Sequence, residues 1–156
     1  MMFKIEQFGG GTVFQIYEHF FLTQSVYEKK VMPVCQKFGL TYMEFTVLMF
    51  LANNPQYDTA AQIVRVRRLT KSHVSMSLRT LQEKKLVAGV HYPGNRKTVH
   101  LKVEQAAQRI VDAGREAQKA FAACLIKGFT PEEALQLKYL SDKLNQNMKQ
   151  EAERNG

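Results

Sequence analysis

The hydrophobic pattern of this sequence has a period of two in one segment only, and that segment limits the folds open to the chain. From Val87 to Val103, apolar and polar residues alternate with a period of two, which is typical of strands with one buried face. Pro93, Gly94 and Asn95 interrupt this alternation with turn-forming residues. The segment is therefore predicted to form a β-hairpin. On both sides of it, apolar residues recur at three- and four-residue steps, which predicts helices.

The helical segments carry start and stop signals. Thr41 and Glu44 have the spacing of a capping box, and Thr130 opens the last helix with a proline in its first turn. Gly39 is a natural stop, whereas Pro33 predicts a kink or a break inside the first helix. The predicted helices cover residues 12–38, 41–53, 59–67, 70–85, 104–127 and 130–148.

The excess positive charge lies in one segment of the chain. The formal net charge of the whole sequence is +8. Residues 59–102 hold ten basic residues and one acid, a net charge of +9, whereas the remainder sums to −1. A solvated protein face normally mixes both signs, so this asymmetry predicts a polyanionic partner. Charge alone does not separate DNA from RNA or from an anionic membrane.

Composition and length exclude several classes of protein. The 156 residues are 45% hydrophobic and 23% charged, which is typical of a globular chain. No apolar run approaches the roughly 20 residues that span a bilayer, and residues 1–11 lack the features of a signal peptide. We therefore expect a cytoplasmic protein without a membrane partner. Two cysteines, Cys35 and Cys124, do not suggest a disulfide framework.

The sequence lacks the motifs of common enzymes. It has no phosphate-binding glycine loop, no nucleophile elbow and no cluster of acids with histidine, so we expect neither catalysis nor a cofactor. The histidines are too widely spaced for a zinc site. Two of them, His91 and His100, are expected to face each other across the hairpin as surface residues.

Two basic helices followed by the hairpin have the order of a winged helix-turn-helix. The second helix begins with Leu69-Thr70-Lys71-Ser72 and continues through Val74, Ser75, Leu78 and the run Leu81-Gln82-Glu83-Lys84-Lys85-Leu86-Val87. The hairpin adds Pro93-Gly94-Asn95-Arg96-Lys97 and Val99-His100-Leu101. In this order and spacing, these residues resemble the MarR family of transcriptional regulators. The resemblance covers nearly the whole chain.

The resemblance implies a mainly α fold with a small β-hairpin wing. We expect a flexible leader over residues 1–11, an N-terminal dimerisation helix over 12–40, a DNA-binding winged helix-turn-helix over 41–103 and C-terminal dimerisation helices over 104–156. By the same resemblance, the terminal helices of two copies intertwine. The homodimer is then expected to act as a repressor on a pseudo-palindromic operator in double-stranded DNA, with half-sites about one helical turn apart.

The second basic helix is expected to read the DNA. With Val74, Leu78 and Leu81 buried, a turn of about 100° per residue leaves a polar face on the opposite side. The expected DNA contacts are Lys71, Ser72, His73, Ser75, Met76 and Arg79 in this helix, Arg96 and Lys97 at the hairpin tip, and Arg65 and Arg68 before the helix. On an isolated helix the same polar residues would only face solvent. The surrounding charge and the hairpin favour DNA contact.

Three positions depart from the family pattern. Lys85 stands where the family often has glycine, and Val103 stands close to a common threonine. Asn95 replaces an acid that commonly orients the wing arginine, which is Arg96 here. The charge of the wing is therefore predicted more firmly than its geometry.

Members of the family often respond to small aromatic or lipophilic ligands, or to oxidants. An aromatic stripe suits such a ligand pocket, although the same stripe is typical of an ordinary core. The expected pocket residues are Tyr17, Phe20, Phe21, Phe38, Tyr42 and Phe45. A redox-sensing regulator of the same fold is the alternative, and it would use Cys35 or Cys124; for both, buried structural cysteine is the expectation. A non-specific basic nucleic-acid-binding protein is the remaining alternative.

Overall fold

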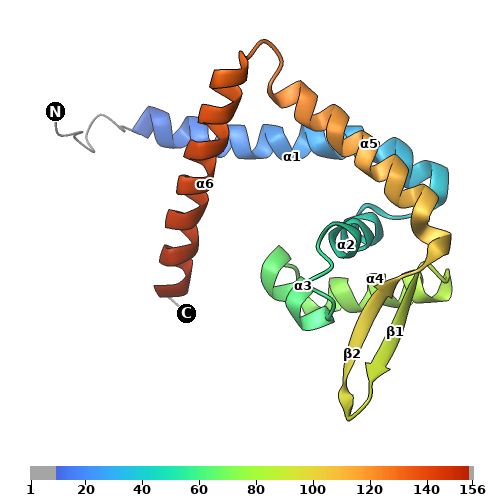
Figure 1. Ribbon diagram of the computed structural model, residues 1–156. Helices are drawn as coiled ribbons and strands as arrows, with labels where there is room; N and C mark the ends of the chain where they lie inside the picture. Colours follow the sequence, from blue (N-terminus) through green and yellow to red (C-terminus); the bar gives the residue numbers. More distant parts are fainter. Residues whose placement is uncertain (1–9, 155–156) are drawn as a thin grey trace. The chain divides into compact units, whose positions relative to one another are not determined.

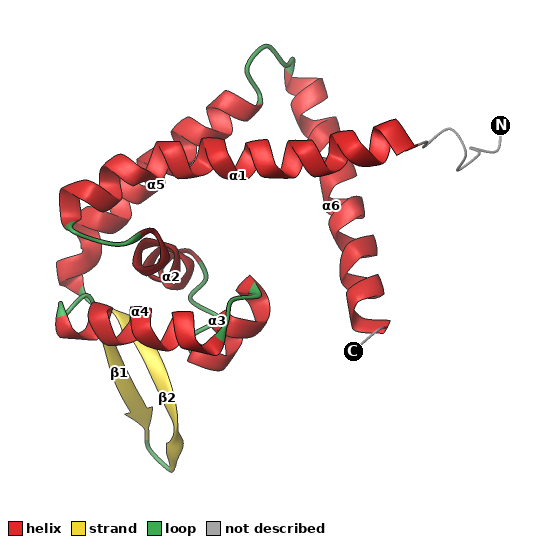
Figure 2. Cartoon of the chain, turned by 180° about the vertical axis from the view of Figure 1, so that it is seen from behind, coloured by secondary structure: helices red, strands yellow, loops and turns green. Residues whose placement is uncertain are grey.

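Between residues 10 and 154, the chain forms six α-helices and one hairpin in the order that the sequence predicts. The computed structural model describes residues 10–154 (Figure 1, Figure 2). The helices are α1 (Gly10–Phe38), α2 (Tyr42–Asn53), α3 (Ala60–Arg67), α4 (Lys71–Glu83), α5 (Gln108–Leu125) and α6 (Pro131–Arg154), with a short 3-10 helix, η2 (Gln105–Ala107), before α5. Strands β1 (Val87–Tyr92) and β2 (Asn95–Val103) pair antiparallel. Residues up to Phe121 form one unit, and those from Ala122 form a second.

Threonine side chains determine where α2, α3 and α4 begin. Thr41 Oγ1 accepts the N–H of Glu44 over 3.2 Å, and Glu44 Oε2 accepts the N–H of Thr41 over 3.1 Å. Thr59 and Gln62 repeat this exchange at α3. Thr70 accepts a first-turn amide of α4. The predicted capping box at Thr41 and the predicted cap at Thr70 are both present.

Three helices end with one residue in the left-handed backbone conformation. These residues are Gly39 (φ 63°), Arg68 (φ 52°) and Lys85 (φ 56°). After each of them, the next residue donates its N–H to a carbonyl five positions earlier, from Leu40 to Cys35, from Leu69 to Val64 and from Leu86 to Leu81. A residue with a Cβ adopts this conformation at a cost of roughly 1–2 kcal/mol, whereas glycine adopts it freely. This turn explains why the resembling family often has glycine at the position of Lys85.

Helix α2 lies at the centre of the first unit (Figure 2). Its Phe45 and Leu48 are fully buried. They share one core with Ile63 of α3, Leu81 of α4 and Val31 of α1. The core therefore joins α1 on one side of α2 to the basic helices on the other.

Helix α5 packs against both α1 and α2. The rings of Tyr27 and Phe121 meet edge to face with centroids 5.1 Å apart, and Gln118 Nε2 donates to the Tyr27 hydroxyl over 2.9 Å. A Cβ at Gly114 would lie 2.5 Å from the sulfur of the buried Met49. A larger residue at position 114 would force the buried side chains of Met49 and Phe45 to shift.

Two helices leave apolar faces uncovered. The exposed apolar residues are Val13, Phe14, Ile16, Tyr17, Phe20, Phe21 and Leu22 in α1, and Leu135, Leu137, Tyr139, Leu140, Leu144 and Met148 in α6. Helix α6 has no buried residue over its described length. None of the helices between residues 10 and 154 combines the length and the hydropathy that crossing a membrane requires.

Helix α1 differs from its prediction at two places. It begins at Gly10, so Gly10 and Gly11 are helical although both were expected in the leader. The rest of that leader, residues 1–9, lies outside the described residues. The helix also continues through Pro33, because a proline removes only one hydrogen bond and the buried residues around it hold the chain to α2.

The C-terminal helices and the hairpin differ from prediction as well. Helix α6 extends beyond Met148 to Arg154, and the ion pair of Lys138 with Asp142 along its exposed surface is one of its supports. In the hairpin, His100 lies opposite Val90 and not opposite the other histidine of the pair, since the register shifts between residues 90 and 92.

Replacing Lys85 by glycine is expected to stabilise the fold by about 0.5–1 kcal/mol, since relief of the left-handed Cβ outweighs the extra freedom of glycine in the unfolded chain. Urea unfolding followed by circular dichroism, at one protein concentration, measures the gain. Lys85→Ala is the control, because it removes the same charge and keeps the Cβ. Equal stabilities of the two variants would show that backbone strain is not the cause.

Candidate nucleic-acid interface

Helix α4 has one buried side and one exposed side. Val74, Leu78 and Leu81 are buried, as the sequence predicts, and Ser77 is buried beside them. The expected contact residues in this helix are all exposed: Lys71, Ser72, His73, Ser75, Met76 and Arg79. The fold thus brings the predicted set to the solvent side of α4.

Met76 is an unusual residue on this surface. Its side chain is 67% exposed, although it is large and apolar. The Ser72 hydroxyl lies 3.9 Å from the Met76 sulfur, one helical turn away. The pair places an apolar group and a hydroxyl side by side in the first half of the helix.

Most of the positive charge in the basic segment is not neutralised by the protein. Lys84 is the exception, because its Nζ lies 3.6 Å from Glu44 and also donates to the carbonyl of Gly39. Among the side chains that the structure describes, the other lysines and arginines of residues 59–102 form no ion pair. Lys84 therefore anchors the end of α4 to the α1–α2 corner, while the remaining cations face solvent.

The tip of the hairpin is organised by Asn95. Its Oδ1 accepts the N–H groups of Lys97 and Thr98, both over 3.2 Å, and its Nδ2 donates to Thr98 Oγ1 over 3.2 Å. Gly94 supplies the left-handed turn residue with φ 83°. The side-chain amide oxygen of Asn95 thus closes this turn and, unlike a carboxylate, brings no negative charge to the hairpin tip. Lys97 is exposed, and the side chain of Arg96 lies outside the described residues.

The base of the hairpin is tied to the start of α3 by Asp58. The Leu101 N–H donates to the Asp58 carbonyl over 2.7 Å, and His100 Nδ1 lies 2.8 Å from Asp58 Oδ2. The Tyr92 ring packs on His100 with centroids 4.3 Å apart. Asp58 in turn donates its N–H to Gln62 of the α3 capping box over 3.0 Å. These contacts set the position of the hairpin relative to α3.

Sequence reasoning missed Asp58. It lies one position before the basic segment and directly before the Thr59 cap, and that junction is the only local signal for it. Its partner His100 is distant in sequence, so no periodicity connects the two. Arg65 and Arg68, by contrast, lie as expected on the exposed end of α3, where Arg68 is the left-handed residue that ends the helix.

The six aromatic residues expected in a ligand pocket differ in burial and do not line one common cavity. Phe45 is fully buried and Phe38 and Tyr42 are half-buried, whereas Tyr17, Phe20 and Phe21 are exposed on α1. Burial raises the pKa of the Tyr42 hydroxyl. None of the six lines the cavity of about 110 Å³ that opens between α1, α2 and α5.

The two cysteines differ in their surroundings. Cys35 is buried, as expected, and burial raises the pKa of its thiol. A backbone hydrogen bond opposes this rise, and the charges of Glu28 and Glu44 add smaller contributions to it. A thiol with a raised pKa is a poor nucleophile at neutral pH. Cys124 is exposed, so the expectation of burial is wrong for it, because α5 has no buried residue from Ala122 to its end at Leu125.

Metal binding finds no support in the described residues. Between residues 10 and 154, no three histidine, cysteine, aspartate or glutamate side chains are grouped as a metal ion would require. The arrangement around α4 is that of an exposed cationic surface.

Comparison with known proteins identifies the family of the basic segment. Residues 38–97 match the model of the MarR family, which confirms the resemblance seen in the sequence. Among curated proteins, no sequence matches this chain.

Solved structures of MarR proteins have the same fold. A MarR family regulator from Listeria monocytogenes, complexed with 26mer DNA, aligns with a TM-score of 0.75 at 16% identity over 85% of this chain and 87% of its own. The MepR–DNA complex of S. aureus aligns with a TM-score of 0.64 at 20% identity, over 91% of this chain and 98% of MepR. Staphylococcus aureus MarR, in complex with salicylate and kanamycin, aligns with a TM-score of 0.74 at 16% identity, over 90% of this chain and 95% of its own. The winged-helix fold class is confirmed.

Disrupting the Asp58–His100 contact is expected to loosen the hairpin. Asp58→Ala or His100→Ala removes a partly buried hydrogen bond between a carboxylate and an imidazole, worth about 1 kcal/mol. Hydrogen exchange at the Leu101 amide should accelerate roughly fivefold in both variants. Lys119→Ala breaks an ion pair on the exposed surface of α5 and should leave that rate unchanged. Unaltered exchange in the Asp58 and His100 variants would contradict an anchoring role.

Proposed function

Since residues 38–97 match the model of the MarR family and α2 to β2 form a winged helix, we propose that the chain is a sequence-specific regulator of transcription that binds double-stranded DNA. The observation that carries this proposal is the solvent side of α4, where the predicted contact residues are exposed beside cations that no acid of the described chain neutralises. An α-helix of this kind fits the major groove of B-DNA. The DNA complexes of the Listeria protein and of MepR support the same use of the fold.

The exposed residues of α4 have distinct roles in this proposal. Arg79 bonds a guanine edge or a phosphate, and Ser72 and Ser75 donate to bases or phosphates. Met76 contacts a thymine methyl group, which suits its exposed apolar side chain. Lys71, in the first turn, binds phosphate together with nearby amides. His73 lies beside this set.

The hairpin and α3 contact the DNA backbone on either side. Arg96 and Lys97 at the hairpin tip enter an adjacent minor groove or bind its phosphates. Arg65 and Arg68 bind backbone phosphates and carry no base preference. The Asp58 anchor supports this division, because it holds the hairpin and α3 together beside α4.

A second copy of the chain covers the exposed faces of α1 and α6. A run of exposed apolar residues along one helix, as on α1 and separately on α6, is seldom left in water by a stable protein. Residues 12–40 and 104–156 are then the dimerisation segments. A two-fold dimer reads a pseudo-palindromic operator with half-sites about one helical turn apart. We propose that the protein acts in the cytoplasm and that it represses transcription from its operator.

Release by a small aromatic or lipophilic molecule is the favoured regulation. Staphylococcus aureus MarR is known in complex with salicylate, which supports such a response within this fold. A thiol switch at Cys35 is disfavoured, because the buried thiol has a raised pKa. Catalysis forms no part of the proposal.

Selection of bound sequences from a random DNA pool tests the proposal directly. A pseudo-palindromic motif, bound in the presence of excess random DNA, is the expected result. Affinity for it should fall steeply with salt, because phosphate contacts release counterions. Equal binding to all sequences would instead support the non-specific alternative.

Arg79→Ala and Lys97→Ala should have different effects on DNA binding. Loss of Arg79 is expected to cost about 1–3 kcal/mol on the selected motif and to relax the preference at one base pair. Loss of Lys97 should weaken all sequences alike and lower the salt slope by about one. Gel-shift titrations on the motif and on a scrambled duplex measure both effects. Identical, sequence-independent losses would refute these roles.

Leu144→Glu is expected to weaken the dimer, because it places a charge on the apolar face of α6. Sedimentation equilibrium should show at least a tenfold weaker association, and operator binding should fall with it. Asn145→Glu is the matched control, with the same new charge on the adjacent exposed residue. A monomeric wild-type chain, or equal effects of both variants, would remove the support for this interface.

A further inference from the structure

The methionine side chains of this protein differ widely in exposure. Between residues 10 and 154 there are five of them. Met49 is 3% exposed, and Met32 and Met43 are half-buried. Met76 and Met148 are 67% and 64% exposed, but Met148 belongs to the apolar face of α6 that the proposed dimer covers. Among these five, Met76 is therefore the exposed methionine that stays open to solvent in the dimer.

The exposed sulfur of Met76 is open to oxidation at any physiological pH. A thioether has free lone pairs and no proton to lose, so its reaction with an oxidant depends on exposure and not on a pKa. Cys35 is the opposite case, because it is buried and burial raises the pKa of its thiol. An oxidant in solution therefore reaches the sulfur of Met76 more readily than that of Cys35.

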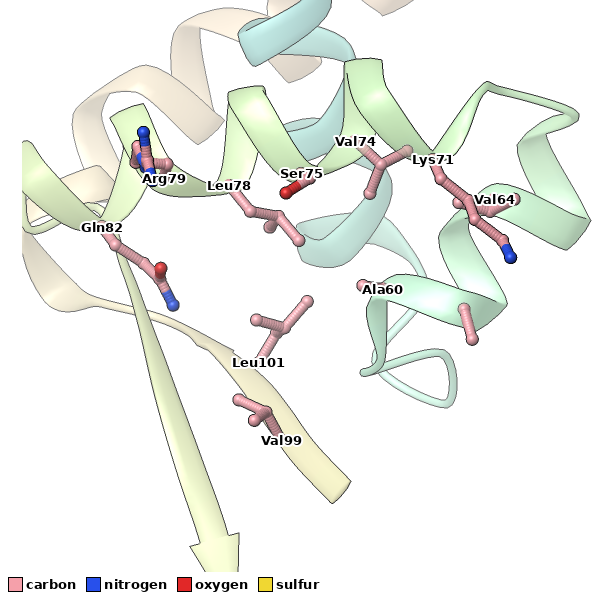
Figure 3. A pocket seen from close by; sticks show the side chains of 11 residues that line it. Ala60, Val64, Lys71, Val74, Ser75, Leu78, Arg79, Gln82, Val99 and Leu101 are labelled. Carbon is pink, nitrogen blue, oxygen red and sulfur yellow. The ribbon is translucent and has the colours of Figure 1, made fainter. Parts of the chain in front are cut away.

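Hydrogen-bond donors lie beside Met76 on the same side of α4. The Ser72 hydroxyl lies 3.9 Å from the sulfur. His73 and Arg79 stand three positions before and after Met76, so they share its side of the helix, and both are exposed. Figure 3 shows Arg79 pointing away from Leu101 of β2. A thioether accepts hydrogen bonds only weakly, whereas a sulfoxide oxygen is polar and would accept from these donors.

We propose that Met76 is a site of reversible oxidation to methionine sulfoxide by an oxidant of the peroxide class. A sulfur lone pair attacks one peroxide oxygen, so that the S–O bond forms while the O–O bond breaks. The sulfur is oxidised by two electrons, and the second peroxide oxygen is reduced and leaves as water with the proton of the first. In the reverse step, two thiols of a methionine sulfoxide reductase system become a disulfide and the sulfoxide oxygen leaves as water.

Oxidation of Met76 weakens DNA binding. This consequence rests on the proposed function, in which Met76 contacts a thymine methyl group. The sulfoxide puts a polar oxygen against that methyl group, where the oxygen loses water and gains no donor. The oxygen also accepts a hydrogen bond from Ser72 or Arg79, which withdraws from DNA a donor that the proposed function assigns to it. Both effects lower the affinity for the operator.

Peptide mass spectrometry after treatment with hydrogen peroxide, without DNA, tests the site itself. Met76 should be converted to the sulfoxide roughly tenfold faster than Met49, because exposure controls the rate. The same treatment in urea should remove the difference, since unfolding exposes both side chains. Oxidation of Met76 no faster than that of Met49 in the folded chain would overturn the proposal.

Gel-shift titration on the selected motif, before and after peroxide treatment, measures the consequence. The apparent Kd of the wild type should rise roughly tenfold, which is comparable to the loss of one base contact. In Met76→Leu, treatment should leave the Kd unchanged, whatever the starting affinity of this variant. Met148→Leu is the matched control, because it removes the other exposed thioether and should respond to peroxide as the wild type does. Equal responses of Met76→Leu and the wild type would contradict the effect assigned to Met76.

Met76→Gln imitates the oxidised side chain without an oxidant. Glutamine and leucine are similar in size, but only glutamine places a polar group at the end of the side chain. The Kd of Met76→Gln for the motif should therefore exceed that of Met76→Leu roughly tenfold. Equal affinities of the two variants would refute polarity at this position as the cause.

Reversal distinguishes Met76 from the exposed thiol of Cys124. Dithiothreitol alone reduces a disulfide or a sulfenic acid but leaves a sulfoxide intact. Affinity should therefore return only when methionine sulfoxide reductases A and B are added with dithiothreitol, since each reduces one epimer. Recovery with dithiothreitol alone would assign the loss to a thiol and overturn the proposal.

The oxidation site and the proposed function fail in different ways. If the untreated chain binds no DNA, the proposed function fails, while mass spectrometry still decides the oxidation site. If Met76 is oxidised selectively and the affinity for DNA is unchanged, the effect on DNA is refuted and the DNA role stands.

Discussion

The burial of α2 is the constraint on which the first unit depends. Its apolar residues point in all directions, and α1, α4 and β2 each contact it. Phe45 and Leu48 reach no solvent, and each fully buried side chain of this kind contributes about 1.5–3 kcal/mol. A helix without a polar side is stable only while all its neighbours remain in place. The elements around α4 and those of α1 and α5 are therefore held by a single shared helix (Figure 1).

A few polar contacts then set the details of the exposed cationic surface. Glu44 caps α2 and also holds Lys84, so one carboxylate links the start of α2 to the end of α4. Asp58 does the same for the hairpin and α3. In both cases an acid near the basic segment is used for positioning. The cations that remain are those that face solvent on α3, α4 and the hairpin tip.

Local signals predicted most of the fold, because caps and hydrophobic periods act between residues a few positions apart. The buried and exposed sides of α4 and the cap at Thr70 were predicted in this way. Contacts between distant segments were not, and Asp58 with His100 is the clearest case. The exposure of Cys124 depends on what covers α5, which no local pattern states. The hollow of about 680 Å³ between α3, α4 and β2 was missed for the same reason, since each of these elements contributes only part of it (Figure 3).

The hydrogen bonds of Asn95 have a consequence for the thermodynamics of any contact at the hairpin tip. The amides of Lys97 and Thr98 are already bonded within the turn, and Gly94 adopts its left-handed conformation without strain. Binding normally costs free energy because loops become ordered in the complex. The cost is about 0.5–1.5 kcal/mol for each flexible side chain that is immobilised, with a further cost for the backbone. A tip that is ordered in advance avoids the backbone part of that entropy loss. Asn95, which stands where the resembling family commonly has an acid, thus keeps the hairpin tip ordered before binding. It does so without the negative charge of an acid, which would repel an anion.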